Sequence, residues 1–267
     1  MAGLPLIRLG SLSLPRLLVG GNPISGFSHQ TNERSSAMVS YFTVGRVKAL
    51  LRDCEKHGIG GWVARADAFI MRVLREYWDE GGAIRWIAQT APEYADPERN
   101  IASAREVGAS AIYVHGGEVD RLMAAGQEAR VVALVERIRE TGLPAGAAAH
   151  VPENHARLQD LGAPVNFHMV CLYNLTGYRG NRARTPEETF EPGDRARALD
   201  SLGLLRNPAI VYKIYGAGRL GPDEAYRDVA LALRPCDGIC VGMFPPDAPD
   251  IVEDNVRRVA SLATAPR

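Results

Sequence analysis

No apolar run in the 267-residue sequence approaches the roughly 20 residues that a membrane-spanning helix needs. The first residues also lack a basic region followed by an apolar stretch, which argues against a cleaved secretion signal. Basic and acidic residues number 31 each, so no excess of one charge is present to attract nucleic acid or an anionic membrane. We therefore expect a cytoplasmic protein that acts on a small-molecule substrate, and assembly into a homo-oligomer stays open.

Cysteines are few, and their positions do not form a metal-binding pattern. The four are Cys54, Cys171, Cys236 and Cys240, each in or beside an apolar segment, and we interpret them as reduced, small core residues. The Cys236-x3-Cys240 spacing has no second pair to complete a zinc site. The sequence therefore does not favour a structural zinc ion.

Short apolar segments recur along the whole chain, most of them ending at glycine or at a polar residue. Such segments are typical of strands that are buried on both faces of a parallel sheet. Eight are found, at Leu17–Gly20, Gly61–Arg65, Ile84–Gln89, Ala111–His115, Ala145–His150, Val165–Leu172, Ala209–Tyr215 and Gly238–Met243.

Helical patterns or long connections separate these segments. The expected helices cover residues 43–56, 69–78, 97–106, 128–141, a short stretch through 158, 223–233 and 251–262. Alternation of strand and helix over eight units predicts a closed parallel sheet, the α/β fold known as the (β/α)8 or TIM barrel. Apolar residues make up 46% of the chain, and no low-complexity segment or domain boundary interrupts it. Residues 1–267 are therefore expected to form a single barrel domain.

Two segments fall outside the repeating pattern. Ile7–Gly10 and Leu12–Leu14 predict a short N-terminal hairpin of the kind that plugs the bottom of a barrel. The connection after the sixth strand, Leu175–Asp194, is long, polar and rich in Gly, Pro and Arg. Long loops in compact domains are usually functional or disordered, so this one is either a lid over the substrate or a surface decoration.

The ends of the expected strands are unusually polar for segments that are otherwise apolar. Because barrel enzymes place their chemistry at the C-terminal ends of the strands, this polar set predicts an active site. The candidates for catalytic groups are Lys213, His115, His150 and Asp67. The candidates for substrate contacts are Asn22, His29, Arg65, Gln89, Tyr173, Asn174, Tyr215, Gly216, Gly218, Arg219, Gly242 and Met243.

Lys213 stands inside an apolar run, between two tyrosines. A lysine that is partly removed from water has a lowered pKa, so its amine can form a Schiff base or act as a general base. Alternatively, the charge is paired with Asp67 or another inward carboxylate, since ion pairs in barrels produce the same pattern.

His115 and His150 end neighbouring strands, so their imidazoles are expected within proton-relay distance of each other. The alternative for each is a hydrogen bond to a backbone carbonyl group. A divalent metal site on these two would need a third ligand, for which Asp67, His29 and His168 are candidates. None of them has the short fixed spacing of a metal motif. His168 lies early in the sixth strand, on the opposite face from Met169 and Cys171, and we interpret it as a structural residue.

The loops after the last two strands are rich in glycine. Gly216, Gly218 and Arg219 follow the seventh strand and Gly242 ends the eighth. Barrels often bind phosphate at these loops, because backbone amides at a helix start converge on an anion. The same glycines also serve tight turns, so the pattern supports an anion site without establishing it.

Three segments resemble the aldo/keto reductases. Ile7–Gly10 through Pro23 is similar to that family's hairpin and first strand, and Ile112–His115 resembles the strand with its catalytic histidine. Val241 through Asn255 is similar to its last strand and helix. The chain also looks like a set of uncharacterised bacterial barrel proteins with a Gly-Gly-Asn start and a lysine in the seventh strand. The resemblance implies a TIM barrel and, for the reductases, an NADP cofactor.

The reductase catalytic set also requires an Asp and a Tyr after the second strand and a Lys at the end of the third. Here Asp67 is slightly displaced, Phe69 stands where the tyrosine is wanted, and the third strand ends in Gln89. A reductase of this type needs its tyrosine as a proton donor, tuned by the lysine. The departures therefore argue against hydride transfer.

The sequence thus predicts a non-redox enzyme, a lyase of the aldolase type or an isomerase. Its substrate is a small polar metabolite with a carbonyl group, and an anionic or phosphorylated one fits the glycine loops. No cofactor is required; NADP or a divalent metal are the alternatives. Two other functions stay open, a reductase with an altered catalytic set and an inactive barrel that binds a ligand.

Overall fold

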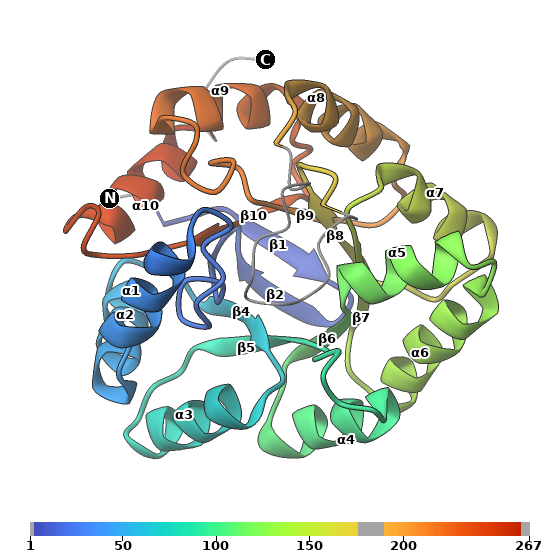
Figure 1. Cartoon of the computed structure of the whole chain (residues 1–267), viewed down its shortest axis with the longest axis horizontal. Coiled ribbons are helices and arrows are strands. Elements are labelled where there is room, and N and C mark those ends of the chain that lie inside the picture. The colour runs from blue at the N-terminus through green and yellow to red at the C-terminus, as the bar shows by residue number, and fades with distance from the viewer. Residues whose placement is uncertain (1–2, 176–189, 263–267) are drawn as a thin grey trace.

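The computed structural model describes residues 3–175 and 190–262, and eight of its strands close into a parallel barrel (Figure 1). The expected TIM barrel is therefore confirmed, with strand order β10-β3-β4-β5-β6-β7-β8-β9 around the ring. The long connection after the sixth barrel strand, including its three arginines, lies mostly outside the described residues.

The strands and helices alternate along the chain. The barrel strands are β3 (Leu17–Gly20), β4 (Gly61–Arg65), β5 (Arg85–Gln89), β6 (Ala111–Val114), β7 (Ala145–Ala149), β8 (Phe167–Cys171), β9 (Ala209–Tyr212) and β10 (Gly238–Gly242). The helices are α1 (Asn32–Tyr41), α2 (Val44–Lys56), α3 (Ala68–Asp79), α4 (Pro97–Val107), α5 (Gly116–Ala124), α6 (Glu128–Glu140), α7 (Pro152–Asp160), α8 (Pro192–Ser201), α9 (Pro222–Ala232) and α10 (Ile251–Leu262). They surround the barrel as an outer ring (Figure 1).

Two apolar layers follow from the alternation of side chains along each strand. Inside the barrel, Val63, Ile87, Phe167 and Met169 form one cluster. The opposite faces of the same strands pack against the helices in a second and larger cluster. Small residues make room in the crowded interior; a side chain at Gly146 would collide with the ring of Phe167.

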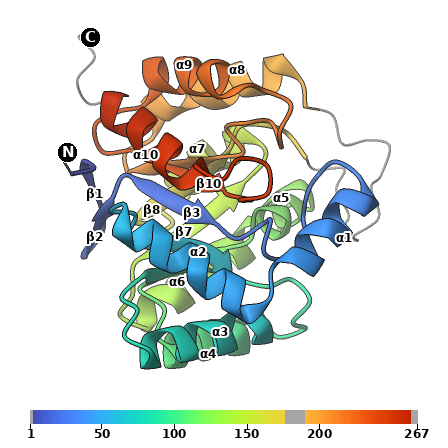
Figure 2. The same cartoon turned by 90° about the vertical axis from the view of Figure 1, so that its left-hand side faces the viewer.

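The predicted hairpin is present and closes the N-terminal end of the barrel. It consists of β1 (Leu6–Leu9) and β2 (Leu12–Pro15), paired antiparallel. Ile7, Leu9 and Leu14 are buried and belong to the interior cluster. Figure 2 shows the hairpin at one end of the barrel and α1 at the other, and side chains of the hairpin fill the barrel interior at the end where it lies.

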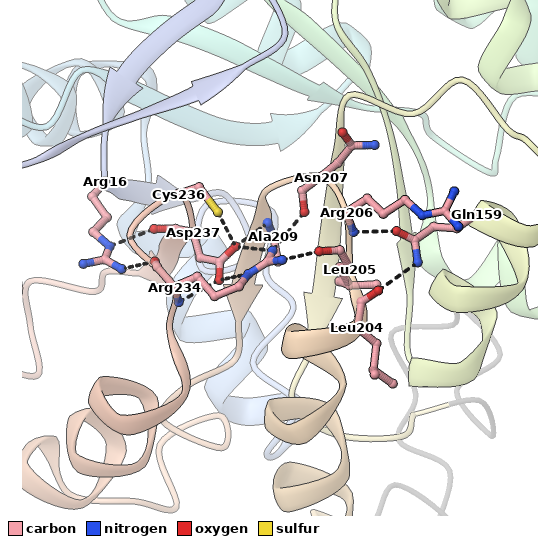
Figure 3. Close-up of polar contacts among 10 residues, drawn as sticks. All are labelled: Arg16, Gln159, Leu204, Leu205, Arg206, Asn207, Ala209, Arg234, Cys236 and Asp237. Atoms are coloured by element: carbon pink, nitrogen blue, oxygen red, sulfur yellow. Dashed lines mark hydrogen bonds and ion pairs between the residues drawn. The ribbon is translucent and has the colours of Figure 1, made fainter. Parts of the chain in front are cut away.

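A network of buried charges ties the strands together beside the hairpin (Figure 3). The Asp237 carboxylate is fully buried and accepts hydrogen bonds from the Ala209 amide at 2.8 Å and from the Arg234 guanidinium at 2.7 and 2.9 Å. Arg234 also donates to the carbonyl oxygens of Leu205 and Asn207, and Arg16 donates to that of Asp237. The network therefore fixes the starts of β3, β9 and β10 relative to one another.

The structure differs from the sequence-based expectation at one strand end that matters for function. The seventh barrel strand was expected to continue to Tyr215, but β9 ends at Tyr212. Lys213 follows with a φ of 62°, in the left-handed region that side chains other than glycine rarely adopt. Lys213 therefore belongs to the turn after the strand and not to the strand itself.

Candidate active site

A cavity of about 630 Å³ opens at the C-terminal end of the barrel. This is where the loops that follow the strands meet, and where barrel enzymes carry their sites. Ten of the sequence candidates line it: Lys213, His115, His150, Asn22, His29, Arg65, Gln89, Tyr215, Gly218 and Gly242. The amine and the two imidazoles on which the prediction rested thus reach one common cavity.

Lys213 enters the cavity from the turn after β9. Its amine lies 5.1 Å from the centre of the Tyr212 ring, within the range of a cation–π contact. Among residues 3–175 and 190–262 it forms no ion pair with a carboxylate, so the expected alternative of a pair with Asp67 is not found there. A half-buried lysine in a strained backbone conformation, beside a cavity, is typical of a functional position.

His115 begins α5, and its ring acts as the cap of that helix. Its Nδ1 accepts a hydrogen bond from the Gly117 amide at 3.1 Å, which leaves the proton of the neutral ring on Nε2. Burial, followed by the nearby His150, Arg65 and Lys213, lowers the pKa of His115 to about 3. At neutral pH this ring is therefore uncharged, with an N–H group that can donate to an oxygen atom of a bound molecule.

His150 has a different partner. Its Nδ1 lies 2.8 Å from Oδ2 of Asp120, and the amide of His150 donates to the same oxygen at 2.9 Å. Asn154 donates to the other oxygen of Asp120 at 2.8 Å, so both oxygens of the buried carboxylate are bound. This arrangement holds the ring and favours the tautomer with the proton on Nδ1, so that proton exchange with a ligand falls to Nε2.

Glycine at position 116 allows this packing. A side-chain carbon there would lie 3.1 Å from Cε1 and 3.4 Å from Nδ1 of His150, closer than most carbon contacts. The residue type at the start of α5 therefore lets the His150 ring lie against the helix that carries Asp120.

Three polar side chains lie in one row across neighbouring strands. In the barrel register Arg65 pairs with Gln89, and Gln89 pairs with Tyr113. All three line the cavity. Burial raises the pKa of Tyr113 well above its usual value, with Gln89 and Arg65 acting in the opposite direction, so its hydroxyl stays protonated.

Three amides of the glycine loop after β9, where the sequence led us to expect an anion site, have partners within their own turn. The amides of Gly216, Gly218 and Arg219 donate to the carbonyl oxygens of Lys213 and Tyr215 within the same turn. The Arg219 guanidinium donates to the carbonyl oxygens of Gly216 and His29, both at 3.0 Å. These hydrogen bonds brace the loop at the rim of the cavity, which Gly218 lines.

Other candidates also have structural partners. Asn22 Nδ2 lies 3.4 Å from Nε2 of His29, at the loop after β3. The Tyr215 hydroxyl donates to Asn255 at 2.9 Å. The Asp67 carboxylate caps α3 by accepting from the Ile70 amide at 2.9 Å, and burial raises its pKa.

Six candidates are not part of the cavity lining: Asp67, Tyr173, Asn174, Gly216, Arg219 and Met243. Tyr173 and Met243 are buried in the core, and the Asn174 amide donates to Asp194. Conversely, Asp120, Tyr113 and Glu93 were not singled out from the sequence. A carboxylate five residues after a strand-end histidine is the only sequence signal for Asp120, and it is weak.

The described residues do not fit the two alternative cofactors. No group of three or more His, Cys, Asp or Glu side chains within them converges where a metal ion could be held. For NADP chemistry of the reductase type, Phe69 at the tyrosine position is 43% exposed on the surface. Tyr113 does line the cavity, but its neighbour in the row is Gln89 in place of the required lysine.

Comparison with known proteins supports the fold alone. No family profile and no curated protein sequence matches the chain. A Pseudomonas aeruginosa protein provisionally assigned as an aldo-keto reductase superposes with a TM-score of 0.62 at 15% identity, over 97% of this chain and 94% of that one. An aldolase, QR15, gives 0.53 at 12% identity, over 82% and 92%. Dihydropteroate synthase of Yersinia pestis gives 0.50 at 10% identity, over 97% of both.

The resemblance to aldo/keto reductase barrels noted in the sequence is therefore confirmed at the level of the fold. The same fold is shared with an aldolase and a synthase, so it does not select one reaction. None of the helices in the described part of the chain has the length and apolar character to traverse a bilayer.

Proposed function

We propose that this protein is a non-redox enzyme that forms a Schiff base between Lys213 and a small polar carbonyl compound, as a lyase of the aldolase type or an isomerase. The observation that carries the proposal is that the Lys213 amine, two histidines with different partners and a sizeable cavity occur together. In an inactive barrel, we would expect the lysine to be held in an ion pair and the mouth of the barrel to be filled by side chains. Neither is seen among the described residues.

The two histidines suit two different tasks. His115 is neutral and presents Nε2–H, which can donate to the carbonyl oxygen and stabilise the negative charge that develops as the amine attacks. A neutral imidazole at the start of a helix is a known electrophile of this kind. His150, with Asp120 behind it, can accept a proton on Nε2 and hold the resulting positive charge.

The first chemical step follows from these roles. His150 takes a proton from the Lys213 amino group, the amine adds to the carbonyl carbon, and His150 returns the proton to the carbonyl oxygen, which becomes a hydroxyl group. Loss of water then leaves an iminium ion, whose positive nitrogen draws electrons from the neighbouring carbon. In a lyase, a base removes the proton of the hydroxyl group two carbons away, and the carbon–carbon bond breaks with its electrons passing to the iminium. In an isomerase, the base removes the proton on the carbon next to the iminium.

Borohydride trapping tests the proposal directly, because hydride reduces the iminium to a stable amine. The protein is incubated with glycolaldehyde, hydroxyacetone or pyruvate, reduced, digested and analysed by mass spectrometry. The chain has three lysines, Lys48, Lys56 and Lys213, which digestion separates from one another and from the N-terminal amine, so the site of any label can be assigned. We expect the label on Lys213, and no label above background on the other two.

The matched control is the double variant Lys48→Arg with Lys56→Arg, which should be trapped like the wild type. Lys48 is held in ion pairs with Glu76 and Glu80 on the outside of the barrel. Lys213→Met should abolish trapping while keeping the fold. Equal labelling of all three lysines, or none at Lys213 with any of the carbonyl compounds, would contradict the proposal.

A further inference from the structure

We infer that the substrate carries a carboxylate group, as a 2-oxo acid does, and that Arg65 binds this carboxylate. The inference rests on the proposed function, because it adds the substrate class to the same site. It starts from the one cationic side chain in the row Arg65, Gln89 and Tyr113.

Arg65 is held as a binding group would need to be. It ends β4 on the inner side of the barrel and lines the cavity, and its side chain is 15% exposed. The guanidinium carbon lies over the ring of Phe27, 5.2 Å from its centre, in a cation–π contact that helps to hold the group in place. The edge of the guanidinium, where the N–H groups are, can then receive the two oxygens of a carboxylate in the paired geometry that arginine favours.

Arg65 lines the same cavity as Lys213 and His115, so an anion on Arg65 can belong to the molecule whose carbonyl group meets the Lys213 amine. A carboxylate matches the paired N–H groups of the guanidinium. Phosphate is the less suited anion, because the loop expected to hold it uses the amides of Gly216, Gly218 and Arg219 internally.

Two of the cationic side chains that line the cavity, Lys213 and Arg65, differ in their partners. Lys213 has no carboxylate partner among the described residues. Arg65 has two, but Asp67 is 3.7 Å away and committed to the cap of α3. The closer one is Glu93, which pairs with Nη2 of Arg65. A second negative group can thus bind here if it replaces Glu93.

The Glu93 side chain lies where a ligand can easily displace it from Arg65. Its side chain is 49% exposed, at the tip of the loop between β5 and α4. That loop is anchored on both sides of the tip, by the Ala91 amide donating to Asn100 and by Asp96 capping α4. We infer that Glu93 occupies the guanidinium in the empty site and moves into solvent when the substrate carboxylate arrives.

Oxamate, the unreactive amide that resembles pyruvate, tests the inference without any chemistry at Lys213. Titration calorimetry should show binding that Arg65→Gln weakens by roughly 10- to 100-fold, the loss expected for hydrogen bonds to a charged group. Arg65→Lys keeps the charge without the paired geometry, so an intermediate loss of oxamate affinity is expected.

Glu93→Gln removes the carboxylate that competes for Arg65 and should tighten oxamate binding by several-fold. Arg72→Gln, on the exposed side of α3, is the matched control and should change nothing.

Three outcomes would overturn the inference: oxamate affinity that is equal in the wild type and Arg65→Gln, oxamate binding that Glu93→Gln weakens, or inorganic phosphate that displaces oxamate at equal concentration. Trapping separates this failure from that of the proposed function. If pyruvate and the neutral hydroxyacetone label Lys213 equally in both the wild type and Arg65→Gln, the Schiff base stands and the carboxylate site fails. If no carbonyl compound labels Lys213 but oxamate binds through Arg65, the carboxylate site stands and the proposed reaction fails.

Discussion

The two ends of the barrel both contain charged side chains that are withdrawn from water, yet their partners differ. At the N-terminal end, Asp237 accepts hydrogen bonds from Arg234 and from the Ala209 amide, and Arg16 completes the network with bonds to backbone oxygens (Figure 3). At the C-terminal end, Lys213 has no ion-pair partner among the described residues, and its neighbours line a cavity.

This contrast separates charges that stabilise the fold from charges that are available for a ligand. Burying a charge is unfavourable unless hydrogen bonds replace its water, and the N-terminal network supplies those bonds from within the chain. At the mouth, Lys213 has a cation–π contact with Tyr212 and no carboxylate partner among the described residues. Residue types alone do not distinguish the two ends, since each combines arginine and aspartate.

The largest expected effect is on stability at the N-terminal end. Asp237→Ala leaves the Arg234 guanidinium and the Ala209 amide without their acceptor, so we expect a loss of about 3–5 kcal/mol in the free energy of unfolding. Urea denaturation followed by circular dichroism measures it. The matched change at the mouth is Asp247→Ala, which removes the half-exposed partner of Arg34 and should cost about 1 kcal/mol or less. Equal losses for the two variants would remove the contrast between the ends.

A second expectation concerns His155 and His168, which are fully buried between α7 and β8. Their Nδ1 atoms lie 3.2 Å apart. Burial and the charge of Arg234 lower the pKa of His168 to about 4, and burial and His168 lower that of His155 well below its usual value. In the unfolded chain both would take up a proton near pH 6.5. Between pH 6.5 and 4 the unfolded state therefore binds more protons, and stability falls as the pH falls.

The expected slope is about 1.4 kcal/mol per pH unit for each histidine that stays neutral in the fold. His168→Phe should remove one such contribution and flatten the plot of unfolding free energy against pH over this window. A wild-type stability that is constant from pH 6.5 to 5 would contradict this reading of the pair.

Much of the fold could be predicted because glycine and polar residues delimit the strands in the sequence. Helices α1, α5 and α8 were not predicted. The start of α5 is Gly116-Gly117, which reads as a turn, and only the His115 cap and the packing of His150 make it a helix start. The seventh barrel strand was predicted three residues too long, because Ile214 and Tyr215 continue the apolar run while the backbone at Lys213 has already turned.

The site could be predicted in part because the sequence shows where the strands end. Strand ends converge in a barrel, so Lys213, His115 and His150 could be placed near one another from their positions alone. The Asp120–His150 contact could not, because it joins residues 30 apart through a helix that was not predicted. Nor does sequence reveal that the amides of Gly216 and Gly218 are used inside their own turn.

A third prediction concerns this missed residue at the mouth. Asp120→Asn keeps the size of the side chain but loses the negative charge that stabilises a protonated His150. We expect the rate of trapping at pH 7 to fall by roughly 10- to 100-fold, as for other partners that orient a functional histidine. The acid limb of the pH–rate profile should also move to lower pH, which a purely structural role would not cause. An unchanged profile with a reduced rate would assign Asp120 to the fold, like Asp237.

The smallest expected effect is a gain in stability at Lys213. Its left-handed φ of 62° is unfavourable for a side chain but not for glycine. Lys213→Gly should therefore raise the free energy of unfolding by about 0.5–1 kcal/mol, after the larger unfolded-state entropy of glycine is counted, while trapping is lost. Lys213→Ala keeps the strain and removes the amine, so its stability should stay near that of the wild type.

If the charge of Lys213 stabilised the fold, both Lys213→Gly and Lys213→Ala would destabilise the protein. That is the result we expect for substitutions in the Arg234 network. A lower stability for Lys213→Gly would therefore place this lysine with the structural charges and undo the distinction between the two ends.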